Sequence, residues 1–225
     1  MPPNNLKKKR KMDRRQALKN IGMGAGFLVA TPTIMSLLQS CENEPEFNTV
    51  FIAKNEGHAL RHIVDLIIPS DDTMPGAVDV GVHSFIDSFW NSVIPEEQQE
   101  HVRIGFRKLS EKFRSTFDKE LEKGDAEEYD QLLQEYLLAD KGTQEGFQEE
   151  MGNFYIAFAQ DPTVEPDVDA SVYSLLSNIR GSAIWAWKNS EEIGENVLWY
   201  DPVPGQQRGC ITSGEAGFEG KAMSL

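Results

Sequence analysis

The sequence predicts an all-α protein, an irregular bundle of about six helices followed by a long non-helical C-terminal arm. Apolar residues recur at intervals of three and four in several separate stretches, which is the periodicity of a helix with one buried face. Prolines and glycines interrupt the chain between these stretches and end helices. No alternating run long enough for a β-strand occurs between them, so the class is helical.

The first two helices are expected on either side of a loop of turn-forming residues. The first covers about 54–68, and Pro69 ends it. The second covers about 79–93, after a loop at 67–77 that contains prolines, aspartates and a glycine. The residues expected to face the core from the second helix are Val82, Phe85, Ile86, Phe89 and Trp90.

The third and fourth helices are indicated by their first turns. Pro95 followed by two glutamates suits a helix N-terminus, and this helix is expected to run to about Glu122, with Gly124 ending it. Asp125 and Glu128 then have the spacing of a capping box, in which each side chain accepts a hydrogen bond from the other residue's backbone.

Two more helices are predicted over about 144–160 and 170–188, joined by a loop with two prolines. From about 189 onward the helical periodicity is lost, and a non-helical arm is expected to the end of the chain. Trp199 and Tyr200 lie in this arm beside prolines. Aromatic residues outside helices are either contact points for a partner or part of a strap that folds back over the bundle.

The first 40 residues are expected to be an export signal and not part of the fold. Arg14 and Arg15 precede an uncharged run over 20–40 that contains three glycines and a proline, which is typical of a twin-arginine signal. The alternative is a retained membrane span, since Ile21 to Leu38 is just long enough to cross a bilayer.

The uncharged run ends in Leu38-Gln39-Ser40-Cys41, the pattern of a lipobox, whose cysteine is acylated and becomes the new N-terminus. A lipidated Cys41 anchors a chain to a membrane surface without spanning it. Residues 42–52 begin with a polar run that contains a proline. Residues 41–53 are expected to be a tether, and residues 54–225 the helical domain with its arm. The expected location is therefore the periplasm, after twin-arginine export, with a lipid anchor in a membrane.

The charge of the chain excludes several kinds of partner. The chain has 22 basic and 36 acidic residues, and the first 40 residues, the expected leader, contain eight of the basic ones and one of the acidic ones. Residues 41–225 therefore contain 14 basic and 35 acidic residues and have a net charge of −21. Nucleic-acid binding needs clustered lysines and arginines, so no nucleic-acid partner is expected. Attraction to anionic lipid headgroups is not expected either.

The chain has two cysteines. If Cys41 is acylated, Cys210 is left in an oxidising compartment as a free thiol or in a bridge to another chain. A disulfide between Cys41 and Cys210 is the competing possibility and would exclude lipidation.

Few residues suggest chemistry. His58, His62 and Asp65 fall at i, i+4 and i+7 of the first helix, and two histidines one turn apart can chelate a metal ion; the alternative is a purely structural role. No dinucleotide fingerprint, phosphate loop or haem-attachment motif occurs outside the leader, and no serine has a convincing histidine partner. No catalytic residue and no cofactor site are therefore expected in this chain.

Two stretches outside the helical pattern resemble a known family. The first is Ile67-Ile68-Pro69-Ser70-Asp71-Asp72, followed by Pro75-Gly76-Ala77, Asp79-x-Gly81-Val82 and Phe85-Ile86-Asp87. The second is Tyr200-Asp201-Pro202-Val203-Pro204-Gly205, closing with Gly209-Cys210. With the twin-arginine leader, they are similar to the small-subunit (subunit 3) family of gluconate 2-dehydrogenase, over about Lys54 to Cys210.

The resemblance implies a non-catalytic subunit that pairs with a large FAD-dependent dehydrogenase of the glucose–methanol–choline type. Such an enzyme oxidises a sugar, sugar acid or polyol and passes the electrons to a cytochrome c. The resemblance implies no cofactor in this chain, FAD in the large subunit and haem c in a third subunit. It also implies that this chain's leader carries the folded large subunit across the membrane, and the lipobox, a departure from the family, would then tether the complex.

The two motifs are also where contact with the large subunit is expected, and Cys210 is a candidate for a disulfide to it. The expected contact residues are Pro69, Asp71, Pro75, Gly76, Trp199, Tyr200, Asp201, Pro202, Pro204, Gly205 and Cys210.

Two other functions stay open on the sequence. One is a stand-alone periplasmic lipoprotein that binds a metal through His58 and His62, or another ligand. The other is an enzyme that acts alone on carbohydrate, which would need a pair of carboxylates in a pocket.

Overall fold

The computed structural model describes residues 47–199 and residue 212 of the 225-residue chain. The described residues form six α-helices, one 3-10 turn and one π-helix, without a β-strand, so the predicted all-α class is confirmed. The helices are α3 (Lys54–Ile67), α4 (Val82–Ser92), α5 (Glu96–Phe117), η1 (Leu121–Lys123), α6 (Ala126–Leu137), α7 (Lys141–Phe158), α8 (Val168–Lys188) and η2 (Ile193–Val197). None of these helices is both long enough and apolar enough to cross a membrane.

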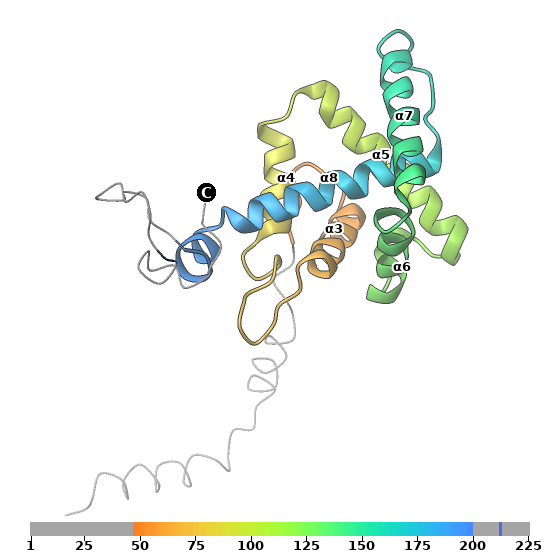
Figure 1. The fold of residues 1–225 in the computed structure, drawn as a ribbon. Coiled ribbons are helices and arrows are strands. Elements are labelled where there is room, and N and C mark those ends of the chain that lie inside the picture. Colours follow the sequence, from red (N-terminus) through yellow and green to blue (C-terminus); the bar gives the residue numbers. More distant parts are fainter. Residues whose placement is uncertain (1–46, 200–211, 213–225) are drawn as a thin grey trace, which may run out of the picture. The chain divides into compact units, whose positions relative to one another are not determined.

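Helix α8 is the central element of the bundle. It contacts each of the other five α-helices, and Figure 1 shows it running between α4 and α3 toward α7. A helix with neighbours on so many sides must be apolar over most of its circumference. The buried residues of α8 are Ala170, Ser171, Val172, Tyr173, Leu175, Leu176, Ile179, Ala183 and Ala186.

The apolar core has a large and a small part. The large part lies among α3, α4, α5, α6 and α8, and its largest fully buried side chains are Trp90, Phe106, Phe113, Tyr129 and Tyr136. The small part lies under α7 and consists of Ile104, Met151, Phe154 and Ala170. Met151 and Phe154 are the two buried residues of α7, so this helix covers the bundle thinly.

The predicted capping box at the start of α6 is confirmed. Asp125 Oδ1 accepts a hydrogen bond from the backbone N–H of Glu128 at 3.1 Å, and Glu128 Oε2 accepts one from the N–H of Asp125 at 3.0 Å. Two N–H groups that a helix leaves unpaired at its start are thereby satisfied.

The predicted end of α5 at Glu122 is wrong. The helix ends at Phe117 because Asp118 adopts a left-handed conformation, with φ of 54°, which aspartate tolerates better than most residues. Gly124 has a packing role instead, since a Cβ there would lie 2.5 Å from Phe113 Cζ and 2.7 Å from Tyr129 Cζ. Without a side chain, Gly124 lets both rings approach the backbone.

The predicted non-helical arm begins later than expected, because η2 follows α8 after a short break. The backbone N–H of Leu198 donates to the oxygen of Ile193 at 2.8 Å, a five-residue spacing that defines a π-helix. Ile193 is completely buried, and its burial offsets the poorer local geometry. The part of the arm from Tyr200 onward lies outside the described residues, apart from Thr212.

The inner face of α4 differs from the prediction. Val82, Ile86 and Trp90 are buried, but Phe85 is 44% exposed and Asp87 takes a place in the interior. Its carboxylate accepts hydrogen bonds from the N–H groups of three successive residues, Val50 at 2.6 Å, Phe51 at 3.1 Å and Ile52 at 3.0 Å. Burying Asp87 turns Phe85 away from the core.

Candidate partner-binding surface

The loop between α3 and α4 is held in one shape by its own polar groups. The N–H of Ala77 donates to the oxygen of Ile68 at 2.8 Å and closes the loop. Inside it, Asp79 Oδ2 accepts hydrogen bonds from the hydroxyl of Ser70 and from the N–H of Gly76. These two donors, the Ser70 hydroxyl foremost, lower the pKa of Asp79 below its ordinary value because they stabilise the ionised form.

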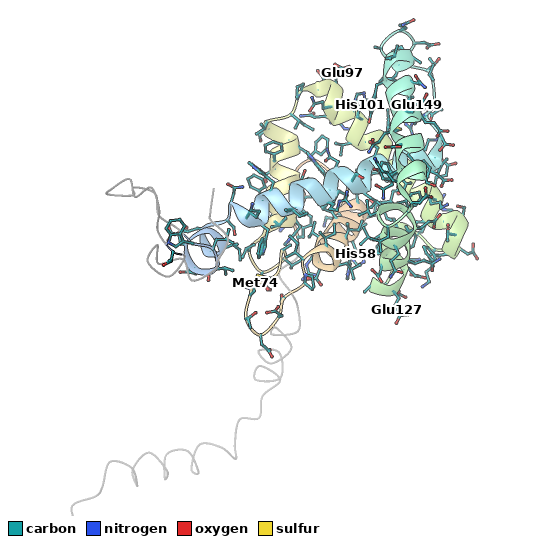
Figure 2. The ribbon with its side chains drawn as sticks, viewed as in Figure 1. His58, Met74, Glu97, His101, Glu127 and Glu149 are labelled. Carbon is teal, nitrogen blue, oxygen red and sulfur yellow. The ribbon has the colours of Figure 1, made fainter. Side chains whose placement is uncertain are left out.

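The tip of this loop is a turn built on Asp71. Its Oδ1 accepts hydrogen bonds from the N–H of Thr73 at 2.7 Å and from the Thr73 hydroxyl at 2.6 Å, which is the turn-forming pattern of aspartate. These bonds lower the pKa of Asp71. Met74, which follows and is labelled in Figure 2, is half-buried.

Gly76 lies against the backbone of the first half of this loop. A Cβ at this position would lie 2.5 Å from the backbone nitrogen of Ser70 and 2.8 Å from the oxygen of Ile68. Both neighbours are backbone atoms that cannot rotate away, so only glycine fits.

The loop is fastened to the far end of α8. The indole Nε1 of Trp187 donates a hydrogen bond to the backbone oxygen of Pro75 at 3.0 Å. Pro75, Asp79 and Val80 then line an open hollow of ≈ 660 Å³ together with η2 and the residues that precede it. The first motif is therefore placed beside the start of the C-terminal arm, although the two are far apart in sequence.

The predicted contact residues that the structure describes differ in accessibility. Pro69 and Asp71 are exposed, Pro75 and Trp199 are half-buried, and Gly76 is buried with a backbone role. The other predicted residues lie outside the described part of the chain, and so do the export and lipidation residues. These are Tyr200, Asp201, Pro202, Pro204, Gly205, Cys210, Arg14, Arg15 and Cys41.

The predicted metal candidates come together only in part. The rings of His58 and His62 lie with centroids 4.5 Å apart, next to the ring of Tyr129. His58 Nε2 is buried without a hydrogen-bond partner among the described residues, whereas Asp65 is exposed. Within residues 47–199 and at 212, no group of three or more His, Cys, Asp or Glu side chains is placed to hold a metal ion.

A second surface feature was not predicted, an exposed aromatic face on α4 and α8. It consists of Phe85 and Phe89, one helical turn apart on α4, and Trp185 on α8. The ring centroids of Phe85 and Phe89 are 5.9 Å apart, and Trp185 lies 5.6 Å from the first and 5.9 Å from the second. The sequence indicates this face only indirectly, because α4 has more apolar residues than the core buries: Val82, Ile86 and Trp90 are buried, whereas Phe85 is not.

The aromatic face borders a cavity of ≈ 410 Å³ among α4, α5, α7 and α8. Its walls include the rings of Phe89, Trp90, Phe154 and Tyr155, and its polar groups include His101 and Ser174. The rings of His101 and Tyr155 have centroids 4.3 Å apart, and the hydroxyl of Tyr155 lies 3.2 Å from that of Ser174. Burial lowers the pKa of His101, more than Glu97 and Glu100 raise it, so this ring is mainly neutral at pH 7.

Comparison with known proteins connects this helical body to one family. The sequence profile described as gluconate 2-dehydrogenase subunit 3 matches residues 54–205, which include every described helix. No curated protein and no solved structure matched the chain. Because the profile covers more than half of the 225 residues, the chain belongs to the gluconate 2-dehydrogenase subunit 3 family.

Proposed function

We propose that this chain is the non-catalytic subunit that exports, stabilises and anchors a FAD-dependent sugar, sugar-acid or polyol dehydrogenase of the glucose–methanol–choline type. The observation that carries the proposal is the family match over residues 54–205. The family is named as a subunit of a dehydrogenase, so an accessory role beside a separate catalytic chain follows from membership.

Export and anchoring are assigned to the N-terminal residues of the chain. Arg14 and Arg15 would direct the protein to the twin-arginine route, which transports folded proteins and so admits a partner that is already bound. Acylated Cys41 would then hold the complex at a membrane surface. FAD would belong to the large subunit, and haem c to a third subunit that receives the electrons.

The loop of the first motif and the C-terminal arm are the proposed contacts with the large subunit. The hydrogen bond between Trp187 and Pro75 supports this, because it places the loop next to the segment that leads into the arm. The loop's internal bonds fix its shape before a partner arrives, and a preformed surface loses less conformational entropy on binding. Cys210 is the proposed site of a disulfide to the large subunit.

Purification of the tagged full-length chain from its native membrane fraction tests the proposal. The expected result is a co-purifying larger chain with flavin absorbance, identified by mass spectrometry. A colourless chain purified alone would overturn the proposal. Replacing Trp199 and Tyr200 by alanine should abolish co-purification, whereas Leu138→Ala, at a 76% exposed leucine at the end of α6, should not. Retention of the large subunit by the double variant would exclude the arm as a contact.

The two N-terminal assignments have their own tests. Replacing Arg14 and Arg15 by lysine should leave both subunits in the cytoplasm. Cys41→Ala should let export proceed but move the complex from the membrane fraction to the soluble periplasm. A complex that stays at the membrane after this substitution would show that another element holds it.

The competing function, a metal-binding lipoprotein, is favoured by the closeness of the His58 and His62 rings. It requires stoichiometric metal. Elemental analysis of the purified chain separates the two functions, since a 1:1 content of one transition metal that is lost in a variant with both histidines replaced would favour the competitor.

A further inference from the structure

The aromatic face of Phe85, Phe89 and Trp185 exposes large apolar surface that the bundle itself does not use. Phe85 is 44% exposed and Trp185 is 50% exposed. Val93 continues the row one turn beyond Phe89 and is 62% exposed. Single exposed apolar residues are common, but a group of touching aromatic rings marks a binding surface.

The surroundings of the aromatic face carry no charge along α4. The one charged residue of this helix is Asp87, which is buried. The exposed polar residues beside the aromatic rings are Ser84, Ser88, Asn91 and Ser92. In a chain with 26% charged residues, this combination of an aromatic centre and a neutral polar rim along α4 is typical of a protein–protein interface. On α8, the charged residue nearest in sequence to Trp185 is Lys188, one turn further along.

The cavity beside the aromatic face is also lined by aromatic and uncharged polar residues. Phe89 belongs to both, so the aromatic face and the cavity are continuous. The described residues that line this cavity include no aspartate, glutamate, lysine or arginine side chain. Its volume of ≈ 410 Å³ is enough for a large side chain with some of its neighbours, and anchoring side chains of partners typically fill such hollows.

We propose that the aromatic face and the adjoining cavity form a second docking surface for the catalytic subunit, which inserts an uncharged aromatic or aliphatic anchor into the cavity. This inference rests on the proposed function, because it takes its occupant from the family's role as a subunit. It adds an apolar contact on α4 and α8, outside both motifs of the family resemblance except at Phe85.

Other occupants fit the chemistry of this surface less well. A second copy of this chain would bring together two bodies with a net charge of −21 each once residues 1–40 are removed, and these repel one another. The chain's own residues 200–225 include five glycines and two prolines and show no helical apolar row, so they offer no regular apolar face of comparable size. A bilayer surface would contact only the protruding apolar side chains of this face. It has no side chain that could fill the adjoining cavity.

Site-specific photocrosslinking identifies the occupant in the intact complex. Phe85 is replaced by benzoylphenylalanine in the full-length tagged chain, and the sample is irradiated and analysed by mass spectrometry. The expected crosslink joins position 85 to the flavin-containing chain. A crosslink to lipid, to residues 200–225 of the same chain, or to a second copy would overturn the proposal. The same replacement at Leu138 is the control and should give no crosslink to the flavin-containing chain.

Substitutions measure the contribution of each part. Phe85→Asp combined with Trp185→Asp should weaken retention of the flavin-containing chain at least about tenfold, and Leu138→Asp should leave it unchanged. Ser182→Trp, which fills the cavity from α8, should weaken retention to a similar degree. Circular dichroism melting of each purified variant checks that the helical body is folded. Folded variants that retain the partner like the wild type would overturn the inference.

The outcomes separate this inference from the proposed function. A wild-type chain that brings down no flavin-containing partner overturns the proposed function, and the inference falls with it. A wild type that brings it down, beside aromatic-face variants that do so equally well, overturns the inference alone.

Discussion

The indole Nε1 of Trp187 lies 3.0 Å from the backbone oxygen of Pro75, and this hydrogen bond joins residues that are 112 positions apart. It fastens the loop before α4 to the last turn of α8. Both partners are half-buried, so the bond is partly shielded from water and its loss leaves the Pro75 oxygen poorly satisfied.

Trp187→Phe should therefore destabilise the protein by about 1 kcal/mol, because it removes one hydrogen bond and retains most of the ring's packing. Urea unfolding followed by circular dichroism measures the change. Trp185→Phe is the matched control, since Trp185 is half exposed on the same helix and should change stability by less than about 0.5 kcal/mol. Equal effects of the two variants would show that the Pro75 bond contributes nothing measurable.

Asp87→Asn should be more damaging, by about 3 kcal/mol. The Asp87 carboxylate is 1% exposed and accepts from three backbone N–H groups of residues 50–52, and hydrogen bonds to a charged acceptor are the stronger kind. An asparagine amide turns its NH2 group toward donors that need an acceptor. Chemical denaturation should show the loss, whereas Asp72→Asn, at an exposed aspartate, should stay within about 0.5 kcal/mol of the wild type.

The same carboxylate explains where prediction from the sequence succeeded and where it stopped. The positions of the helices were predictable because their signals are local, as in the Asp125–Glu128 capping box three residues apart. The orientation of α4 about its axis was not predictable, because the buried Asp87 has its hydrogen-bond partners 35 to 37 residues away. Without that information, a polar residue is ordinarily assigned to the surface. Phe85 was consequently predicted to be inside.

The candidate surface shows the same limit. The loop was recognised as a turn, and the role of Asp71 follows from the usual chemistry of aspartate in turns. Its attachment to Trp187, and the meeting of Phe85 with Trp185, depend on how α4 and α8 pack, which no periodicity within one helix records. Sequence alone could name the residues of the first motif but could not place them beside η2.

Gly76→Ala should destabilise the protein by about 2 kcal/mol, because the new methyl group would overlap backbone atoms of Ile68 and Ser70. It should also weaken binding of the large subunit by displacing the loop. Gly152→Ala is the control: this helical position has open space around a Cβ, and alanine should stabilise α7 by up to about 1 kcal/mol. Thermal melting and flavin retention are measured for both variants, and a Gly76 variant as stable as the wild type would show that the loop can shift freely.

Stability should fall as the pH is lowered from about 7.5 to about 5.5, the range in which histidine titrates. Burial lowers the pKa of both His83 and His101 from the ordinary value of 6.5, and the nearby Arg61 adds to the effect at His83. Below pH 6.5 the unfolded chain therefore binds more protons than the folded chain, so the stability that these residues contribute above that pH is lost as the pH falls through their folded pKa values.

Replacing His83 and His101 by phenylalanine together should make the urea midpoint nearly constant over this pH range. Phenylalanine keeps the ring contacts of His101 with Tyr155 and Phe158 but cannot take up a proton. The midpoint is measured at several pH values for the wild type, both single variants and the double variant. An unchanged pH dependence in the double variant would assign the loss of stability to other groups.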